Sequence, residues 1–381
     1  MNRRVAIAGV GLSESGSVPQ FSAFQLLARA SRRALVETGL KPEDIDGFGS
    51  TGLGVLPPIE VAEHLGLRPT WLEATSVGGS TWEVMAAHAV DAIAQGHAET
   101  VLLAYGSTAR SDVKLGRRSA NMSFGSAGPA QFDTPAGASL VSKYAMAAQR
   151  HMHEYGTTID QLATVAVEAR RFAELNPAAE RRTPMSLDDV HGARMIATPF
   201  TSPHCCLRSD GAAAVILTTE ERARDLPQTP VQVLGSAEHA SHSTMSQWED
   251  FTVSPAAVTG PLAFKRAGVT PSDIDVCQIY DAFTYGVVVT LEDLGFCAKG
   301  EGGAFVTETG IGPGGGLPVN TDGGGLSACH PGMRGLFLLV EATRQLRGEA
   351  EARQVPDAAL ACVSGTGGWF SSSATMILAR D

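Results

Sequence analysis

Long apolar runs are missing from this 381-residue sequence, and positive charge is in short supply. No apolar stretch reaches the roughly 18 residues of a membrane-spanning helix, so no span is expected. Lys and Arg total 29 against 40 Asp and Glu, and the net charge of −11 argues against a nucleic-acid binder. With 44% hydrophobic and only 18% charged residues, the composition is that of a well-packed globular protein.

Cysteine is absent from the first 204 residues, and the six cysteines that follow include no C-x-x-C pair. Reduced thiols in the cytoplasm are therefore expected. The N-terminus, MNRRVAIAGV, predicts a first strand and not a signal peptide. His151 and His153 have a spacing that suits a metal only on a strand, whereas the surrounding pattern is helical. No metal site is predicted.

An order of elements seen in the first half of the chain returns in the second half. The turn LKPEDIDG at 40–47 matches VTPSDIDV at 269–276. A predicted helix at 80–95 is followed by the strand ETVLLAY at 99–105, and a helix after His330 is followed by a strand at 358–363. We infer an internal duplication with halves of about 1–225 and 228–381.

One difference separates the halves. About a hundred residues follow the strand at 99–105 before the strand around Ala212, where the second half has about ten. The first half therefore carries an inserted subdomain at about 107–205, with predicted helices at 139–155 and 159–175. Two α/β halves that share one core, with active loops at their junction, are the expected architecture.

Glycine-flanked segments fall at equivalent strand or helix ends. They are SVGGST at 76–81, YDAF at 280–283, SGTGG at 364–368 and the loop NTDGGGLSACHPGMRG at 320–335. In the last of these, His330 lies where the loop meets the predicted helix, and Pro331 suits the first helical position. His330 is either a catalytic imidazole or a helix cap, and spacing alone leaves both open.

Together with CLRSDGAAAVIL at 206–217, these motifs resemble the thiolase superfamily in its sterol-carrier-protein and lipid-transfer-protein branch. The resemblance covers essentially the whole chain. It implies a thiolase fold, in which duplicated α/β halves form a layered αβαβα arrangement. It also implies a thioester pocket lined by Ser76, Val77, Gly79 and Gly365, with backbone N–H groups around Val77 and Gly365 able to hold a thioester oxygen.

The departures from the family pattern bear on the chemistry. Ser76 stands where the family has its nucleophilic cysteine, and a hydroxyl is far less acidic than a thiol. The family's His-Asp-Cys-Phe motif reads Tyr280-Asp281-Ala282-Phe283 here, so a histidine and a second cysteine are missing. Of the family's catalytic groups, His330 is retained. Claisen chemistry through a cysteine acyl-enzyme is not expected.

This combination resembles the lipid-transfer-protein-type aldolases of steroid side-chain degradation. The resemblance implies retro-aldol cleavage of a β-hydroxyacyl-CoA, such as a 17-hydroxy steroid with a C22 side-chain CoA ester, to a ketone and propionyl-CoA. Tyr280 and Tyr285 are the candidate proton acceptors, with Tyr285 ranked slightly higher, and His330 would hold the enolate oxygen. A tyrosine needs help for this role because its ordinary pKa is about 10.

The same resemblance implies a homodimer core and a second polypeptide, an OB-fold protein with a zinc-binding segment, in an α2β2 assembly. The acyl-CoA is substrate, and no cofactor is expected. Two alternatives stay open: an acyltransferase that uses Ser76 with His330 as base, and a non-catalytic acyl-CoA or lipid-binding protein. The basic residues Arg110, Lys114, Arg117 and Arg118 are either a solvated loop or a contact for CoA phosphates or a partner.

Overall fold

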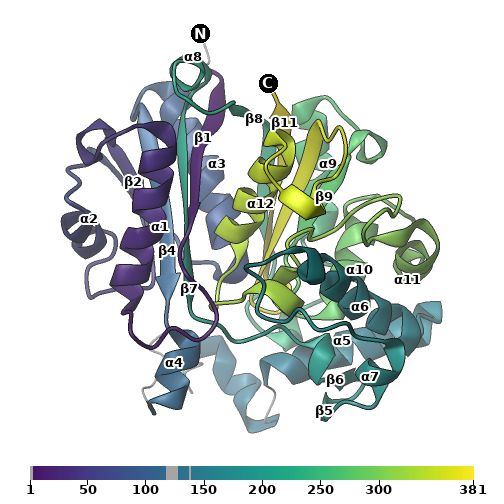
Figure 1. The fold of residues 1–381 in the computed structure, drawn as a ribbon. Coiled ribbons are helices and arrows are strands. Elements are labelled where there is room, and N and C mark those ends of the chain that lie inside the picture. The colour runs from purple at the N-terminus through teal and green to yellow at the C-terminus, as the bar shows by residue number, and fades with distance from the viewer. Residues whose placement is uncertain (1–2, 117–127, 137–138) are drawn as a thin grey trace.

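The computed structural model describes residues 3–116, 128–136 and 139–381 (Figure 1). The described chain contains the following helices: α1 (Ala23–Thr38), α2 (Ile59–Leu65), α3 (Thr81–Gln95), α4 (Ala109–Lys114), α5 (Leu140–Tyr155), α6 (Ile159–Leu175), α7 (Leu187–His191), α8 (Glu220–Arg224), α9 (Ala256–Ala267), α10 (Thr284–Asp293), α11 (Gly302–Phe305) and α12 (Gly335–Arg347). Its strands are β1 (Val5–Leu12), β2 (Gly47–Gly49), β3 (Trp71–Glu73), β4 (Thr100–Ser107), β5 (Met195–Ala197), β6 (Phe200–Thr201), β7 (Gly211–Thr219), β8 (Val231–Ala240), β9 (Val276–Ile279), β10 (Leu360–Gly367) and β11 (Ser372–Arg380).

The strands of the two halves follow one plan. Within the described residues, nine strands are hydrogen-bonded in the order β3-β2-β4-β7-β1-β8-β11-β10-β9. Going outward from β1, the neighbouring pairs β1–β7 and β7–β4 are antiparallel, and the pairs β4–β2 and β2–β3 are parallel. Going outward from β8, the pairs β8–β11 and β11–β10 are again antiparallel and the pair β10–β9 is parallel. A parallel bridge from Cys277 to Val319 takes the place of the fourth pair. The duplication read from the sequence is thus visible in the strand order.

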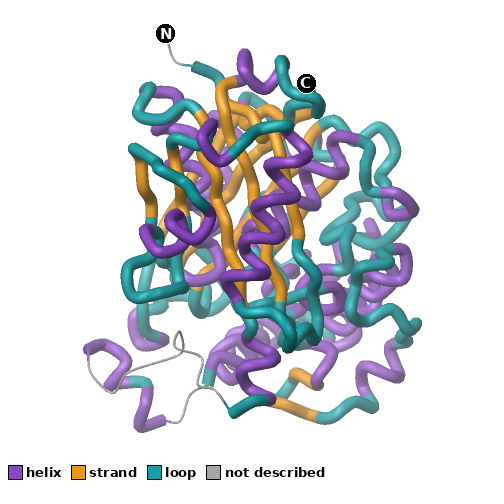
Figure 2. The backbone as a smooth tube through the Cα atoms, turned by 60° about the vertical axis from the view of Figure 1, so that its left-hand side comes forward, coloured by secondary structure: helices purple, strands orange, loops and turns teal. Residues whose placement is uncertain are grey.

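The helices separate into outer and middle layers (Figure 2). Helix α1 packs on one face of β1, β4 and β7 and keeps a solvent-exposed side. Helices α3 and α12 lie between the sheet halves, where their side chains share a core cluster with β1, β4, β7, β10 and β11. Because they are covered on several sides, the first turns of both helices are almost entirely buried. Helix α9 closes the outer face of β8 and β11, which completes the αβαβα layering.

The inserted segment packs at the end of the strands opposite the chain termini (Figure 1). Its helices α5 and α6 begin at capping boxes formed by Ser139 with Ser142 and by Thr158 with Gln161. Both helices lie within one residue of their predicted bounds. Arg117 and Arg118, from the basic cluster noted in the sequence, lie outside the described residues.

The predicted start of the last long helix is wrong. Helix α12 begins at Gly335, not at Pro331, and His330 lies in the preceding loop. Gly332 has a φ of +104°, which a right-handed helix does not allow. The carbonyls of Pro331 and Cys329 accept hydrogen bonds from Tyr105 Oη and Arg334 Nη1 instead. His330 is therefore not a helix cap.

No helix of the described chain combines the length and the apolar character that a membrane crossing requires.

Candidate active site

The loop from Asn320 to Arg334 is held by side chains from the ends of neighbouring elements. The amide oxygen of Asn320 accepts from the N–H of Ile279 at 2.8 Å. The Asp281 carboxylate accepts from the N–H groups of Gly325 at 2.7 Å and Leu326 at 3.1 Å. These bonds join the YDAF segment to the histidine loop, so the two motifs form one site.

A buried arginine fixes the second part of the loop. Arg334 is fully buried, and its Nη2 lies 2.5 and 2.6 Å from the two carboxylate oxygens of Asp322. Its Nη1 donates to the carbonyl of Cys329 at 2.8 Å, next to His330. The backbone around the imidazole is thus tied to an ion pair in which Arg334 is fully buried and the Asp322 side chain is only 12% exposed.

Replacing Arg334 with methionine is expected to lower the free energy of unfolding by about 3 kcal/mol, because Asp322 would stay buried without its partner. Denaturant titration measures this change. Arg171→Met is a matched control, since Arg171 is half-exposed in its pair with Glu168 and should contribute little. Equal losses in the two variants would contradict a structural role for the buried pair.

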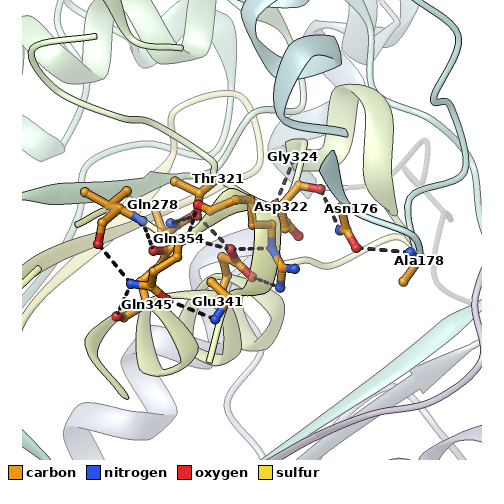
Figure 3. Close-up of polar contacts among 12 residues, drawn as sticks. Asn176, Ala178, Gln278, Thr321, Asp322, Gly324, Glu341, Gln345 and Gln354 are labelled. Atoms are coloured by element: carbon orange, nitrogen blue, oxygen red, sulfur yellow. Dashed lines mark hydrogen bonds and ion pairs between the residues drawn. The ribbon is translucent and has the colours of Figure 1, made fainter. Parts of the chain in front are cut away.

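A second polar network anchors the start of the loop to α12 and the segment after it (Figure 3). Glu341 receives two hydrogen bonds from Arg353, each of 2.9 Å, and one from Thr321 Oγ1 at 2.7 Å. Gln278 donates to the same threonine at 3.0 Å. Because these partners come from separate parts of the second half, the loop conformation depends on the folded half as a whole.

Tyr280 and His330 meet at the centre of the site. The Tyr280 hydroxyl lies 3.1 Å from His330 Nε2, and the two rings are edge to face. Both residues come close to the surface without being open to it, with exposures of 6% and 8%. The Tyr280 ring also lies against Gly79, where an added Cβ would come within 2.4 Å of Cζ. Gly79 thus brings the first half of the chain onto the pair.

Burial sets the charge state of this pair. It lowers the pKa of His330 to about 4, and the charge of Arg334 acts in the same direction. Burial also raises the pKa of Tyr280 well above its ordinary value, and Cys206, Tyr105, Tyr144 and Glu83 add to the rise. At neutral pH the site therefore holds a neutral imidazole bonded to a neutral phenol. A proton can pass along this hydrogen bond without leaving a lasting charge in the apolar interior.

The chain is similar in sequence to several known proteins. The family described as "Thiolase C-terminal domain-like" matches residues 237–380. An acetyl-CoA acetyltransferase of Methanothermobacter thermautotrophicus is 33% identical over 99% of this chain and 100% of its own. A steroid side-chain-cleaving aldolase of Thermomonospora curvata is 34% identical over 90% of both chains. A 17-hydroxy-3-oxo-4-pregnene-20-carboxyl-CoA lyase of Mycobacterium tuberculosis is 31% identical over 91% and 92%.

Among solved structures, "Ltp2-ChsH2(DUF35) aldolase" matches with a TM-score of 0.90 and 32% identity, over 99% of this chain and 98% of that one. The human mitochondrial 3-ketoacyl-CoA thiolase, at 15% identity over 99% of both chains, shares the fold with a TM-score of 0.72. This chain belongs to the thiolase superfamily. Its relatives include the sterol carrier proteins and the side-chain-cleaving aldolases, as the sequence motifs predicted.

Within this thiolase fold, no cysteine of the described residues is placed as a nucleophile. Cys329 is buried beside His330, but its Sγ points to the carbonyl of Asp210 at 3.9 Å, and burial raises its pKa to about 12. Burial likewise raises the pKa of Cys205 to about 12. Ser76, at the position of the thiolase cysteine, is exposed, while the His330 Nε2 that would have to serve it as base is bonded to Tyr280.

The predicted thioester-binding segments lie together, although one donor is already used. Gly78 approaches Gly367 and Gly368 so closely that a Cβ on it would lie 2.6 Å from the Gly368 nitrogen. Gly365 lies two and three residues before these positions, on β10. The N–H of Val77 donates to Thr81 Oγ1 at 2.9 Å, so it is not free for a thioester oxygen.

Tyr285, the higher-ranked tyrosine in the sequence, is directed elsewhere. It is fully buried on α10, and its hydroxyl donates to the carbonyl of Phe251 at 3.1 Å. Its ring lies against His151 and Phe370. Tyr280 precedes α10, which begins at Thr284, so helical spacing does not relate the direction of its side chain to that of Tyr285.

Tyr285→Phe is expected to retain most of its turnover and to lose about 1 kcal/mol of stability with its hydrogen bond to Phe251. Steady-state kinetics beside thermal unfolding separates these effects. A loss of turnover as large as that of Tyr280→Phe would restore Tyr285 as a catalytic candidate.

Sequence reasoning missed two residues at this site. Tyr144 of the inserted segment donates to the carbonyl of Gly368 at 3.0 Å, which ties α5 to the closing glycine strand. Glu83 is fully buried in the first turn of α3. A signal for Glu83 was present, because one acid interrupts an otherwise apolar helix start, TWEVMAA.

Proposed function

We propose that this chain is a carbon–carbon lyase that cleaves a β-hydroxyacyl-CoA by retro-aldol reaction. The substrate in this proposal is a 17-hydroxy steroid with a C22 side-chain CoA ester, and the products are the 17-ketone and propionyl-CoA. The observation that carries it is the Tyr280–His330 hydrogen bond in a thiolase site without a cysteine nucleophile. The names of the Thermomonospora and Mycobacterium relatives support the substrate class.

In the proposed reaction the bond between the α- and β-carbons breaks, and its electron pair becomes the thioester enolate. The β-hydroxyl proton passes to Tyr280 Oη as the phenol proton passes to His330 Nε2. Because burial lowers the pKa of His330 to about 4, the imidazolium returns its proton readily. The relay then protonates the α-carbon, so no proton is gained or lost overall. Backbone N–H groups of Gly78 and Gly79 would hold the enolate oxygen.

The decisive assay incubates the enzyme with the steroid CoA ester and follows the 17-ketone and propionyl-CoA by mass spectrometry. The rival acyltransferase reaction predicts an acyl group on Ser76 after incubation with acyl-CoA. Retro-aldol products with an unmodified Ser76 are expected, and Ser76→Ala should keep most of the activity because Ser76 is exposed, whereas Tyr280 and His330 are buried. An acyl-Ser76 adduct without ketone formation would overturn the proposal.

We further propose that the chain works as a dimer with a DUF35 partner that contains an OB-fold and a zinc-binding segment, in an α2β2 complex. The structural relative titled "Ltp2-ChsH2(DUF35) aldolase" supports this partner class. Val113, Leu115 and Phe132 of the inserted segment are more than half exposed, with Phe132 at 72%, and offer apolar contact area. Co-expression with a DUF35 protein should yield a stable complex of two copies of each chain. A lone chain with full activity would contradict the need for a partner.

A further inference from the structure

Glu83 is a buried acid for which the fold provides a space but no counter-charge. Its exposure is 0%, and within the described residues neither carboxyl oxygen has a hydrogen-bond partner from another residue. Buried carboxylates are normally paired, because an isolated charge in an apolar interior costs far more than folding can supply. A glutamate that lacks a partner in the middle layer therefore needs an explanation.

Two glycines make room for this side chain. A Cβ on Gly335, the first residue of α12, would lie 2.4 Å from Glu83 Oε2, and a Cβ on Gly365 of β10 would lie 2.2 Å from the same oxygen. Both glycines belong to the loop motifs that build the active site. The carboxyl group thus lies behind the site, between the end of the histidine loop and the closing glycine strand.

The turn Gly78–Ser80, which directly precedes α3, connects Glu83 to the proton relay. Ser80 lies one turn before Glu83, and a Cβ on Gly365 would lie 2.9 Å from its Cα. Gly79 lies against the Tyr280 ring. A negative charge on Glu83 disfavours loss of the Tyr280 proton, and this effect adds to the larger ones of burial and of Cys206, Tyr105 and Tyr144. Glu83 is therefore coupled to Tyr280 through the interior rather than through solvent.

The elements that pack against α3 place few other charged groups near its N-terminal end, where Glu83 lies. Arg334 precedes Gly335 but is paired with Asp322. Tyr105 of β4 lies against Trp82, and its hydroxyl donates to Pro331. On β8, Glu238 is bound to His88, more than a turn further along α3. Strands β1 and β7 bring no charged residue, β10 brings the thiol of Cys362, and β11 brings only Arg380 at its far end.

We propose that Glu83 is a positioning residue for Tyr280 in the proposed reaction: it stays neutral behind the phenol, and its ionisation shuts the relay off. The inference rests on the proposed function, since it requires Tyr280 to carry the substrate proton. Glu83 itself touches neither substrate nor His330. Burial raises the pKa of Glu83 to about 8, which places this shut-off just above neutral pH.

The test is the pH dependence of kcat for retro-aldol cleavage by the complete enzyme with its partner. Wild-type kcat should fall at least about tenfold between pH 7 and 9.5, and the falling limb should be absent in both Glu83→Gln and Glu83→Leu, which cannot ionise. Glu220→Gln is the matched control, because Glu220 is also buried but is paired with Arg224 on α8. It should lose stability and keep the wild-type profile.

A second readout does not depend on turnover. Carbon-13 NMR of glutamate-labelled enzyme, assigned with Glu83→Gln, should show Glu83 protonated at pH 7. A falling limb that persists in both Glu83 variants, or a Glu83 already ionised at pH 7, would overturn the inference. A wild-type enzyme that releases no ketone at any pH would instead overturn the proposed function, and the inference with it.

Discussion

Replacement of Tyr280 by phenylalanine is expected to lower kcat for retro-aldol cleavage by about a hundred- to ten-thousand-fold. The variant keeps the ring that packs on Gly79 and removes only the hydroxyl that meets His330 Nε2 at 3.1 Å. The proton of the β-hydroxyl then has no acceptor within the relay. Single-turnover measurement of ketone release isolates this step from product dissociation.

Tyr285→Phe serves as the control for Tyr280→Phe, because Tyr285 is also buried and its hydroxyl donates to the backbone carbonyl of Phe251. KM should change little in Tyr280→Phe, since Gly78 and Gly79 are proposed to bind the thioester. Activity within a few-fold of wild type in Tyr280→Phe would remove the tyrosine from the mechanism and leave His330 to accept the proton directly.

The second large effect concerns stability and pH. Burial raises the pKa of Glu83 from its ordinary 4.5 to about 8. Below pH 4.5 the carboxyl is protonated in the folded and unfolded states alike. As the pH rises from 4.5 to 8, the unfolded chain loses this proton and the folded protein keeps it, so the folded state becomes less stable. The free energy of unfolding falls by about 1.4 kcal/mol per pH unit in this range, and the total loss approaches about 5 kcal/mol by pH 8.

Glu83→Gln should therefore become more stable relative to wild type as the pH rises. The difference between their free energies of unfolding should grow by about 5 kcal/mol between pH 4.5 and 8.5. Denaturant titrations of both proteins across this range measure it, and all other ionisable groups cancel in the difference. Thr343→Val, a buried change on α12 that does not titrate, should give a difference independent of pH. A constant difference for Glu83→Gln would mean that its carboxyl is ionised in the folded protein.

The loop around His330 shows how much of a site a sequence can predict. Its glycines and its His-Pro-Gly order identified the motif, and resemblance to a family predicted that Tyr280 and Gly79 belong to the same site. The start of α12 was predicted four residues too early, because Pro331 suits a first helical turn locally. The carbonyls of Pro331 and Cys329 instead accept hydrogen bonds from Tyr105, which is 226 residues away in the sequence, and from the nearby Arg334.

The sequence by itself determined the duplicated α/β architecture, the absence of a cysteine nucleophile and the retention of His330. Periodicity, chain order and residue identity are local properties, so they can be read without coordinates. Only the tertiary structure showed that Tyr280, and not Tyr285, meets His330, that the Val77 N–H already has an acceptor and that Glu83 lies behind the site. These outcomes depend on which face of a helix meets which strand, and that is settled by packing between segments hundreds of residues apart.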